Sequence, residues 1–242
     1  MKKRRMLVNL FFIVLFIFSM FGILKPYVLE AKIKNNTNDI VEDIAEMTSQ
    51  KTNVLENDTT TTSTNITEIS TEVSTEETKK FNIDWMKEVH NVTEKDYLNA
   101  ISVGLIEIPD SKISVGLRYG TRYKSNIESA AGITEFSTDE RLYILGHNYK
   151  NGTIFHNLLE TKPGEKVYIT LVNKDKNIFN KYTFEVVFTK RYTEKEYEKD
   201  NFKVLTDNPD YHTEYDLVLA TCNHYSKSDQ GRQVVLCRLV EE

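Results

Sequence analysis

From residue 102 to residue 240 the chain is a series of short apolar segments that have the length and residue types of β-strands. Val, Ile, Tyr, Phe and Thr dominate these segments, and polar stretches separate them. We expect strands at 102–108, 112–118, 141–146, 166–173, 181–191, 214–221 and 232–240. Helices are expected at 84–100, 122–130 and 153–160. Many short strands with few helices predict a mainly β fold, in the form of a closed or nearly closed β-barrel.

The N-terminus has a different character. Residues 1–5, MKKRR, are followed by an apolar run from Met6 to Leu24 that contains no charged residue. As a helix this run would be about 28 Å long, close to the thickness of a bilayer core. A cleaved signal peptide is the alternative, but the run is long for one and no small-x-small cleavage site follows. We therefore expect a single-pass membrane anchor with 1–5 in the cytoplasm and the remainder outside the cell.

A polar connection separates this anchor from the predicted barrel. Residues 25–47 are mixed and charged, with a short helix expected at 40–47, and residues 48–78 are rich in Thr, Ser, Glu and Asn. The latter stretch has no aromatic residue and cannot bury enough apolar surface to offset its ordering entropy. We interpret 25–80 as an extracellular, disordered tether and 81–242 as the folded domain. The formal net charge of -5 does not indicate a nucleic-acid surface.

Both cysteines of the chain lie in LVLATCNHYSKSDQGRQVVLCRLV, residues 217–240. If this stretch forms a hairpin around a polar loop at 223–231, Cys222 lies opposite Arg232 at the mouth of the loop. Cys237 then lies roughly 16 Å from Cys222, along the second strand. A disulfide requires Cα atoms within about 7 Å, so this spacing argues against a bridge. We expect Cys237 to pack as a small apolar residue and Cys222 to be accessible.

A cysteine nucleophile requires a base and a group that stabilises negative charge. His147 directly follows the apolar segment LYILG, at the end of a predicted strand, and is the best candidate for the base, with a structural histidine as the alternative. Arg232 keeps its charge and offers planar donors for an oxyanion or a carbonyl oxygen. The alternative for Arg232 is a salt bridge at the barrel rim, for example to Asp216 or Asp229. The remaining histidines lie in predicted helices or polar loops: His90, His156, His212 and His224.

Two stretches together resemble the sortases, the membrane-anchored cysteine transpeptidases of Gram-positive bacteria. They are LYILGHNYKNGTIFHNLLETKPGEKVYITL at 142–171 and DLVLATCNHYSKSDQGRQVVLCRLV at 216–240. The first resembles the family's G-H-N segment, and the second resembles its Thr-Cys strand, loop and arginine strand. The resemblance covers roughly 100–242, and the N-terminal anchor and tether are also typical of the family.

The resemblance implies a barrel of about eight strands, with the catalytic groups at the ends of neighbouring strands. It implies that Cys222 is the nucleophile, His147 the general acid/base, and Arg232 the cation that binds substrate and stabilises the oxyanion. Thr221 would bind substrate or shape the site. The implied reaction cleaves a C-terminal sorting signal in a secreted protein. The thioacyl intermediate then passes to an amine of a peptidoglycan precursor or a pilin, and no cofactor or metal takes part.

The subclass stays open. The G-H-N segment, the ten-residue step from Cys222 to Arg232, and the long connection at 191–213 resemble class B. In contrast, the stretch 117–140 is short for class B, and its ESAAGITEF resembles other classes.

Two other functions are compatible with the residues. The same thioacyl chemistry with water as acceptor would make the chain a cysteine protease or hydrolase. A tethered wall-binding or zinc-binding module is the non-enzymatic alternative, with Cys222, His224 and His147 as ligands. Neither a C-x-x-C nor an H-x-x-x-H spacing favours the zinc site.

Overall fold

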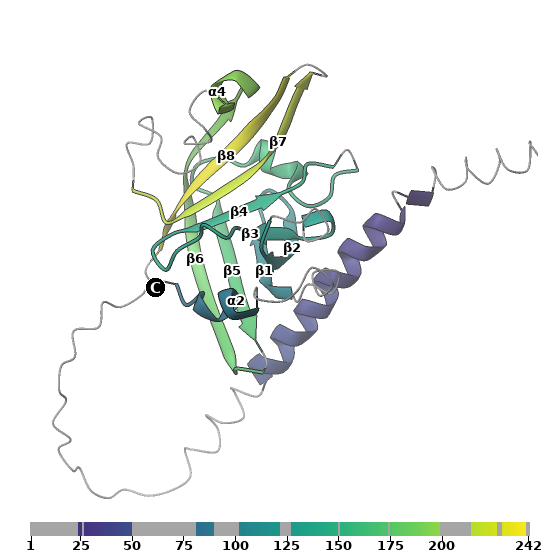
Figure 1. The fold of residues 1–242 in the computed structure, drawn as a ribbon, viewed down its shortest axis with the longest axis vertical. Coiled ribbons are helices and arrows are strands. Elements are labelled where there is room, and N and C mark those ends of the chain that lie inside the picture. The colour runs from purple at the N-terminus through teal and green to yellow at the C-terminus, as the bar shows by residue number, and fades with distance from the viewer. Residues whose placement is uncertain are drawn as a thin grey trace, which may run out of the picture.

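The computed structural model describes residues 24–25, 27–49, 81–89, 102–121, 127–149, 151–173, 175–198, 214–226 and 229–240. Within these residues lies a closed barrel of eight strands, in the order β1-β2-β3-β4-β7-β8-β6-β5 (Figure 1). The strands are β1 (Ser102–Ile108), β2 (Ile113–Tyr119), β3 (Ala131–Ile133), β4 (Leu142–Gly146), β5 (Lys166–Asn173), β6 (Ile178–Tyr192), β7 (Leu217–Ser226) and β8 (Asp229–Leu239). The predicted mainly β fold with a closed barrel is confirmed.

Two strand pairs in the barrel are parallel, β2 with β3 and β4 with β7. The other pairs are antiparallel, and β1 closes the barrel by pairing with β5 as well as with β2. Because β4 and β7 run in the same direction, their C-terminal ends lie at the same edge of the barrel. Residues that are distant in the sequence, after Gly146 and after Thr221, are thereby brought side by side.

The barrel interior is filled by apolar side chains that alternate along the strands. Each strand contributes a fully buried residue to one continuous core. These residues are Ile106, Leu117, Ile133, Ile144, Ile169, Phe184, Leu219 and Val235. Successive side chains of a strand point to opposite faces, so one face of each strand fills the barrel.

The outer faces of β4, β7 and β8 are also buried. Val218, Ala220, Val234 and Leu236 point away from the core and form a second cluster with several tyrosines. Burial on both faces explains why 217–220 and 234–237 read as continuous apolar runs rather than alternating ones.

Three short helices accompany the strands: α2 (Asp84–Val89), the 3-10 helix η3 (His156–Glu160) and α4 (Glu194–Glu198). Helix α2 lies at the opposite end of the barrel from α4 (Figure 1). Trp85 and Met86 of α2, with Phe81 before it, are buried in the barrel core. The predicted helix at 84–100 is described as far as Val89, and 90–100 lie outside the described residues. The expected helix at 122–130 is seen only at 127–128, since 122–126 also lie outside them.

The strand predictions are close to the structure, with two differences. Strand β3, only three residues long, was not expected. The hairpin of β7 and β8 is longer than predicted, because pairing continues to Ser226 and Asp229 instead of stopping at 222 and 232. The expected polar loop at 223–231 is therefore mostly strand.

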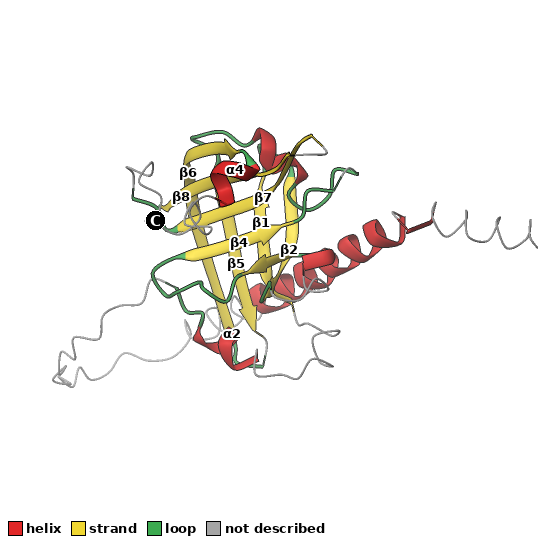
Figure 2. Ribbon diagram, turned by 45° about the horizontal axis from the view of Figure 1, so that its top comes forward, coloured by secondary structure: helices red, strands yellow, loops and turns green. Residues whose placement is uncertain are grey.

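The largest difference concerns the expected tether. Residues 27–49 are helical, and the helix runs along the outside of the barrel (Figure 2). Ile33, Ile40 and Met47, spaced by seven residues, are buried by contact with the rest of the protein. Ile40 and Met47 pack with Leu105 and other residues of the barrel's outer surface. This part of 25–80 is thus an ordered arm rather than a tether, whereas residues 50–80 lie outside the described residues.

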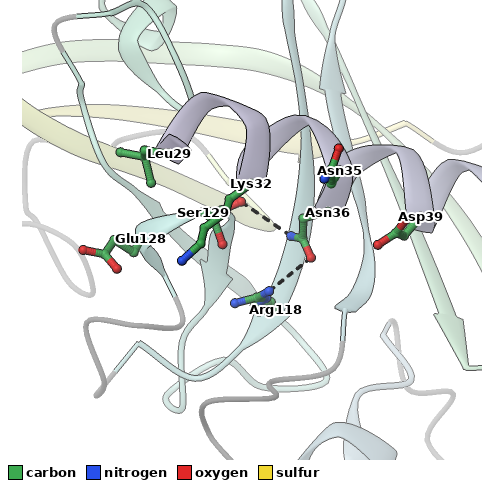
Figure 3. A pocket seen from close by; sticks show the side chains of 8 residues that line it. All are labelled: Leu29, Lys32, Asn35, Asn36, Asp39, Arg118, Glu128 and Ser129. Atoms are coloured by element: carbon green, nitrogen blue, oxygen red, sulfur yellow. Dashed lines mark hydrogen bonds between the residues drawn. The ribbon is translucent and has the colours of Figure 1, made fainter. Parts of the chain in front are cut away.

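Polar contacts fix the position of this helix on the barrel. The Asn36 side chain accepts a hydrogen bond from Arg118 Nη2 at 3.1 Å (Figure 3) and another from Ser102 Oγ at 3.0 Å. Its Nδ2 reaches the carbonyl of Ser129 at 3.5 Å. A polar pocket of about 410 Å³ lies beside these bonds, between the helix and the barrel. Burial lowers the pKa of Arg118.

In the part of the chain that the structure describes, no helix is both long enough and apolar enough to cross a membrane. The predicted anchor, 6–24, lies outside the described residues except for Leu24.

Candidate active site

The registers of β4, β7 and β8 arrange their outward-facing side chains in rows across the barrel wall. Leu145 of β4 pairs with Ala220 of β7, which pairs with Val234 of β8. The next row towards the C-terminal end of β7 holds reactive groups in place of these apolar ones. Cys222 pairs with Arg232 on β8, and since Gly146 pairs with Thr221, His147 lies beside Cys222 on the other side.

Neighbouring strands are about 4.8 Å apart, so this row places an imidazole and a guanidinium on either side of one thiol. The three side chains are half-buried, and they line a shared pocket of about 240 Å³. Apolar residues form much of the remaining lining: Ile127, Leu145, Gly146 and Ala220. The structure therefore brings together the three residues predicted to be catalytic.

The two cysteines occupy different environments, and both are free thiols. Cys237 pairs with Leu217, five residues before Cys222 on β7, as the strand arithmetic predicted. Its side chain is fully buried in the barrel core, and this burial raises the pKa of the Cys237 thiol. Cys222 lies on the outer face within β7, not at the mouth of a loop, because the hairpin is longer than expected.

Gly146 leaves room for a large neighbour directly before His147. A Cβ atom added to Gly146 would lie 2.5 Å from Cδ2 of Phe155, which is fully buried. The Phe155 backbone N–H donates to the carbonyl of His147 at 3.1 Å, and the ring of Tyr149 packs 5.1 Å from the imidazole. His147 is therefore held at the end of β4 by the segment that follows it.

Asn148 connects this segment to the cysteine strand. Its Nδ2 donates to the carbonyl oxygen of Cys222 at 2.8 Å, and its Oδ1 lies 2.7 Å from Nδ1 of His156. The Cys222 carbonyl can only accept, which fixes the amide orientation, and Nδ1 of His156 then donates. Sequence reasoning did not select Asn148 or His156 for the site, although Asn148 lies within the G-H-N segment.

Thr221 is 2% exposed, and its hydroxyl donates to the carbonyl of Gly146 at 2.8 Å. This bond ties β7 to β4 one residue before the reactive row. The geometry supports a role for Thr221 in shaping the site, while its predicted role in binding substrate stays a prediction.

Arg232 lies against a residue that the sequence did not suggest. Its Cζ is 4.7 Å from the ring centroid of Tyr197, on α4, and its Nη1 donates to the carbonyl of Gly231 at 3.0 Å. The suggested partner Asp216 lies at the other end of the hairpin, where its Oδ2 accepts the N–H of Leu239 at 2.7 Å. The side chain of Asp229 lies outside the described part of the structure.

The described side chains contain no group of three or more His, Cys, Asp or Glu that could hold a zinc ion. The side chain of His224, one of its suggested ligands, is not among them, and His90 and His212 also lie outside the described residues.

Comparison with known proteins gives a family match. The family described as "Sortase domain" matches residues 106–240. Sortase A of Listeria monocytogenes is 22% identical, with 58% of this chain and 88% of that chain covered and a TM-score of 0.45. A pilus-related sortase C of Group B Streptococcus is 21% identical (58% and 68% covered, TM-score 0.45). A sortase D5 transpeptidase of Clostridium perfringens is 20% identical (65% and 95% covered, TM-score 0.43). No curated protein matches the chain.

Proposed function

The chain belongs to the sortase family, and from this premise we propose that it is a cysteine transpeptidase that acts at the outer surface of a cell membrane. Residues 1–5 would lie in the cytoplasm, 6–24 would form the anchor, and the barrel would carry the catalytic site. The observation that carries the proposal is the row His147–Cys222–Arg232, whose three side chains line one pocket.

Cys222 is the nucleophile in this proposal. Its sulfur attacks the carbonyl carbon of the scissile peptide bond, and the electron pair of the carbonyl moves to the oxygen. Arg232 stabilises this oxyanion with its fixed charge and planar donors. His147, as the imidazolium, gives its proton to the leaving nitrogen, the C–N bond breaks, and a thioester remains on Cys222.

The second half of the reaction restores the enzyme. An amine attacks the thioester carbon, His147 accepts a proton from the amine, and the Cys222 thiolate leaves. A new amide bond then joins the cleaved protein to the acceptor. We propose a secreted protein with a C-terminal sorting signal as the substrate, and an amine of a peptidoglycan precursor or a pilin as the acceptor.

Hydrolysis is the competing outcome of the same intermediate. If water reaches the thioester before an amine does, the product is a free carboxylic acid and the chain is a protease. The half-buried position of the reactive row and its apolar lining favour exclusion of water, and thus transfer.

A peptide library tests this function. The full chain, purified in detergent, is incubated with a pooled, internally quenched peptide library, with and without an added amine such as triglycine. The proposal predicts cleavage at one short motif and an amide product with the amine. Free acid alone with diglycine, triglycine and lysine-containing acceptors would identify a hydrolase, and no cleavage with any peptide would contradict both enzymatic functions.

A further inference from the structure

Helix α4 packs against β8 and β6 and brings Tyr197 to the active-site pocket. The Tyr197 side chain lines this pocket with Cys222 and Arg232, although the residue is only 9% exposed. Its ring packs in the same cluster as Val218, Ala220 and other outward residues of the hairpin. Tyr197 is therefore a buried and packed part of the pocket wall.

The short helix that carries Tyr197 is fixed by its own first residues. The Thr193 backbone N–H and hydroxyl each donate to Oε2 of Glu196 at 2.8 Å, and Thr193 Oγ1 accepts the Glu196 N–H at 3.3 Å. This reciprocal arrangement is a capping box. The Tyr197 N–H closes the turn by donating to the Thr193 carbonyl at 3.0 Å. The backbone from which the Tyr197 ring extends is thus held in place at the start of α4.

The ring of Tyr197 lies in stacking contact with the guanidinium of Arg232, with 4.7 Å from Cζ to the ring centroid. A long arginine side chain has much rotamer entropy, which it loses when its head group is held in one place. An aromatic face attracts the cation and restrains its plane at once. Together with the bond from Nη1 to the Gly231 carbonyl, the ring determines where the guanidinium lies relative to Cys222.

The pKa of the Tyr197 phenol responds to burial, to Arg232 and to Cys222. Burial raises the pKa of the Tyr197 phenol, the charge and hydrogen bond of Arg232 act in the opposite direction, and the charge on Cys222 raises the pKa further. The phenol therefore keeps its proton at neutral pH, and it does not compete with the substrate as a second anion for Arg232.

We propose that Tyr197 is a positioning residue, whose ring face holds the Arg232 guanidinium in the orientation that stabilises the oxyanion on the substrate of Cys222. This inference rests on the proposed function. It makes α4, which lies on the connection between β6 and β7, a component of the active site. Tyr197 acts through Arg232 and does not itself react.

The chain offers a matched control for this stack. Tyr215, 8% exposed, lies beside Arg141, with 4.1 Å from the guanidinium carbon to the ring centroid. Tyr215 precedes β7, at the end of the hairpin remote from Cys222. Replacing Tyr215 removes a similar stack and a similar buried ring without touching the reactive row.

The test measures kcat/KM on the pooled quenched library for the full chain and for Tyr197→Leu, Tyr197→Phe and Tyr215→Leu. We expect Tyr197→Leu to lower kcat/KM about tenfold, which corresponds to about 1.4 kcal/mol. Tyr197→Phe loses the hydroxyl that interacts with Arg232 but keeps the ring face, so it should stay within about threefold of wild type. Tyr215→Leu should reduce the melting temperature as much as Tyr197→Leu does, but leave kcat/KM within about twofold.

A double mutant separates positioning from general damage. In an Arg232→Ala background, Tyr197→Leu should cause no further loss, because the group that it positions is gone. The same tenfold loss in both backgrounds, an equal loss in Tyr215→Leu, or an unchanged Tyr197→Leu would each overturn the inference. If wild type itself cleaves no peptide, the proposed function fails and this inference fails with it, whereas an active wild type with an active Tyr197→Leu refutes the inference alone.

Discussion

The side-chain amide of Asn148 donates a hydrogen bond to the backbone carbonyl of Cys222, with 2.8 Å between Nδ2 and O. Asn148 follows His147 directly, so this bond connects the segment of the proposed base to the strand of the proposed nucleophile. On its other side the side-chain oxygen of Asn148, Oδ1, accepts a hydrogen bond from Nδ1 of His156. The spacing between thiol and imidazole therefore depends on a residue that reacts with neither.

Asn148→Ala removes this connection and leaves the Cys222 carbonyl without its donor. We expect the free energy of unfolding to fall by about 1 kcal/mol and the rate of Cys222 acylation to fall several-fold. Chemical denaturation measures the first effect. Stopped-flow acylation with an intact library peptide that the enzyme cleaves measures the second. Asn151→Ala is the control, because Asn151 is exposed and accepts only a local bond from Thr153 in the structure's described contacts. Equal effects from both changes would contradict the connecting role.

Arg232→Lys tests whether charge alone is sufficient. Lysine keeps the positive charge but loses the planar donors and the flat surface that stacks on Tyr197. We expect kcat/KM to fall a hundredfold or more, as for the loss of an oxyanion donor. Arg238→Lys, at an exposed position on the same strand, should stay near wild type. Wild-type kinetics for Arg232→Lys would show that Arg232 has no directional role.

Ile40→Ala tests the packing of helix 27–49 on the barrel. Ile40 is 1% exposed, while the adjacent Val41 is 44% exposed. Removing the buried side chain should lower the free energy of unfolding by about 2 kcal/mol or more, and Val41→Ala should change it by less than about 0.5 kcal/mol. The fluorescence of Trp85, the single tryptophan, reports on the barrel. If neither change affects unfolding, residues 27–49 behave as the tether that the sequence suggested.

Cys237 should make stability depend on pH in the alkaline range. Burial raises the pKa of its thiol in the folded state above the ordinary value of 9.0, so above that pH the unfolded chain loses a proton that the folded chain keeps. The contribution is fully present below pH 9 and declines as the pH rises beyond it, by up to about 1.4 kcal/mol per unit. Urea unfolding of wild type and Cys237→Ala between pH 8 and 10.5 measures this slope.

Cys237→Ala should be less stable than wild type at pH 8, because a cavity remains in the core. Its free energy of unfolding should nevertheless decline less steeply as the pH rises. Cys222→Ala serves as the comparison. The pH dependence of its free energy of unfolding should be closer to that of wild type than the pH dependence of Cys237→Ala is. Identical slopes for Cys237→Ala and wild type would mean that Cys237 ionises in the folded protein.

Much of the reactive row could be predicted from the sequence because it depends on local counting. Cys222 and Arg232 lie opposite each other in a hairpin, so their pairing follows from the spacing along one short stretch. The longer hairpin moved both residues inside the strands without changing the pair. His147 could be selected because a strand end is visible in the sequence, although its place beside Cys222 depends on the parallel pairing of β4 and β7.

The remaining features depend on contacts that no local pattern contains. Strand β3 has three residues, too few for an alternation to show. Tyr197 meets Arg232 because α4, on the connection that follows β6, packs against β8. The arm at 27–49 is indicated in the sequence only by the seven-residue spacing of Ile33, Ile40 and Met47. Because the residues between them are mostly polar or charged, this pattern is weak.

The central claim is that Cys222 carries the acyl group, and intact-mass spectrometry followed by trypsin digestion tests it directly. The full chain is mixed with an intact library peptide that it cleaves, and the reaction is quenched in acid, which preserves a thioester. Trypsin cuts after Lys227 and Arg232, so the two cysteines fall on different fragments. We predict one acyl group per chain, on the Cys222 fragment, present in Cys237→Ala and absent in Cys222→Ala. An adduct on the Cys237 fragment, or cleavage that continues in Cys222→Ala, would contradict this account.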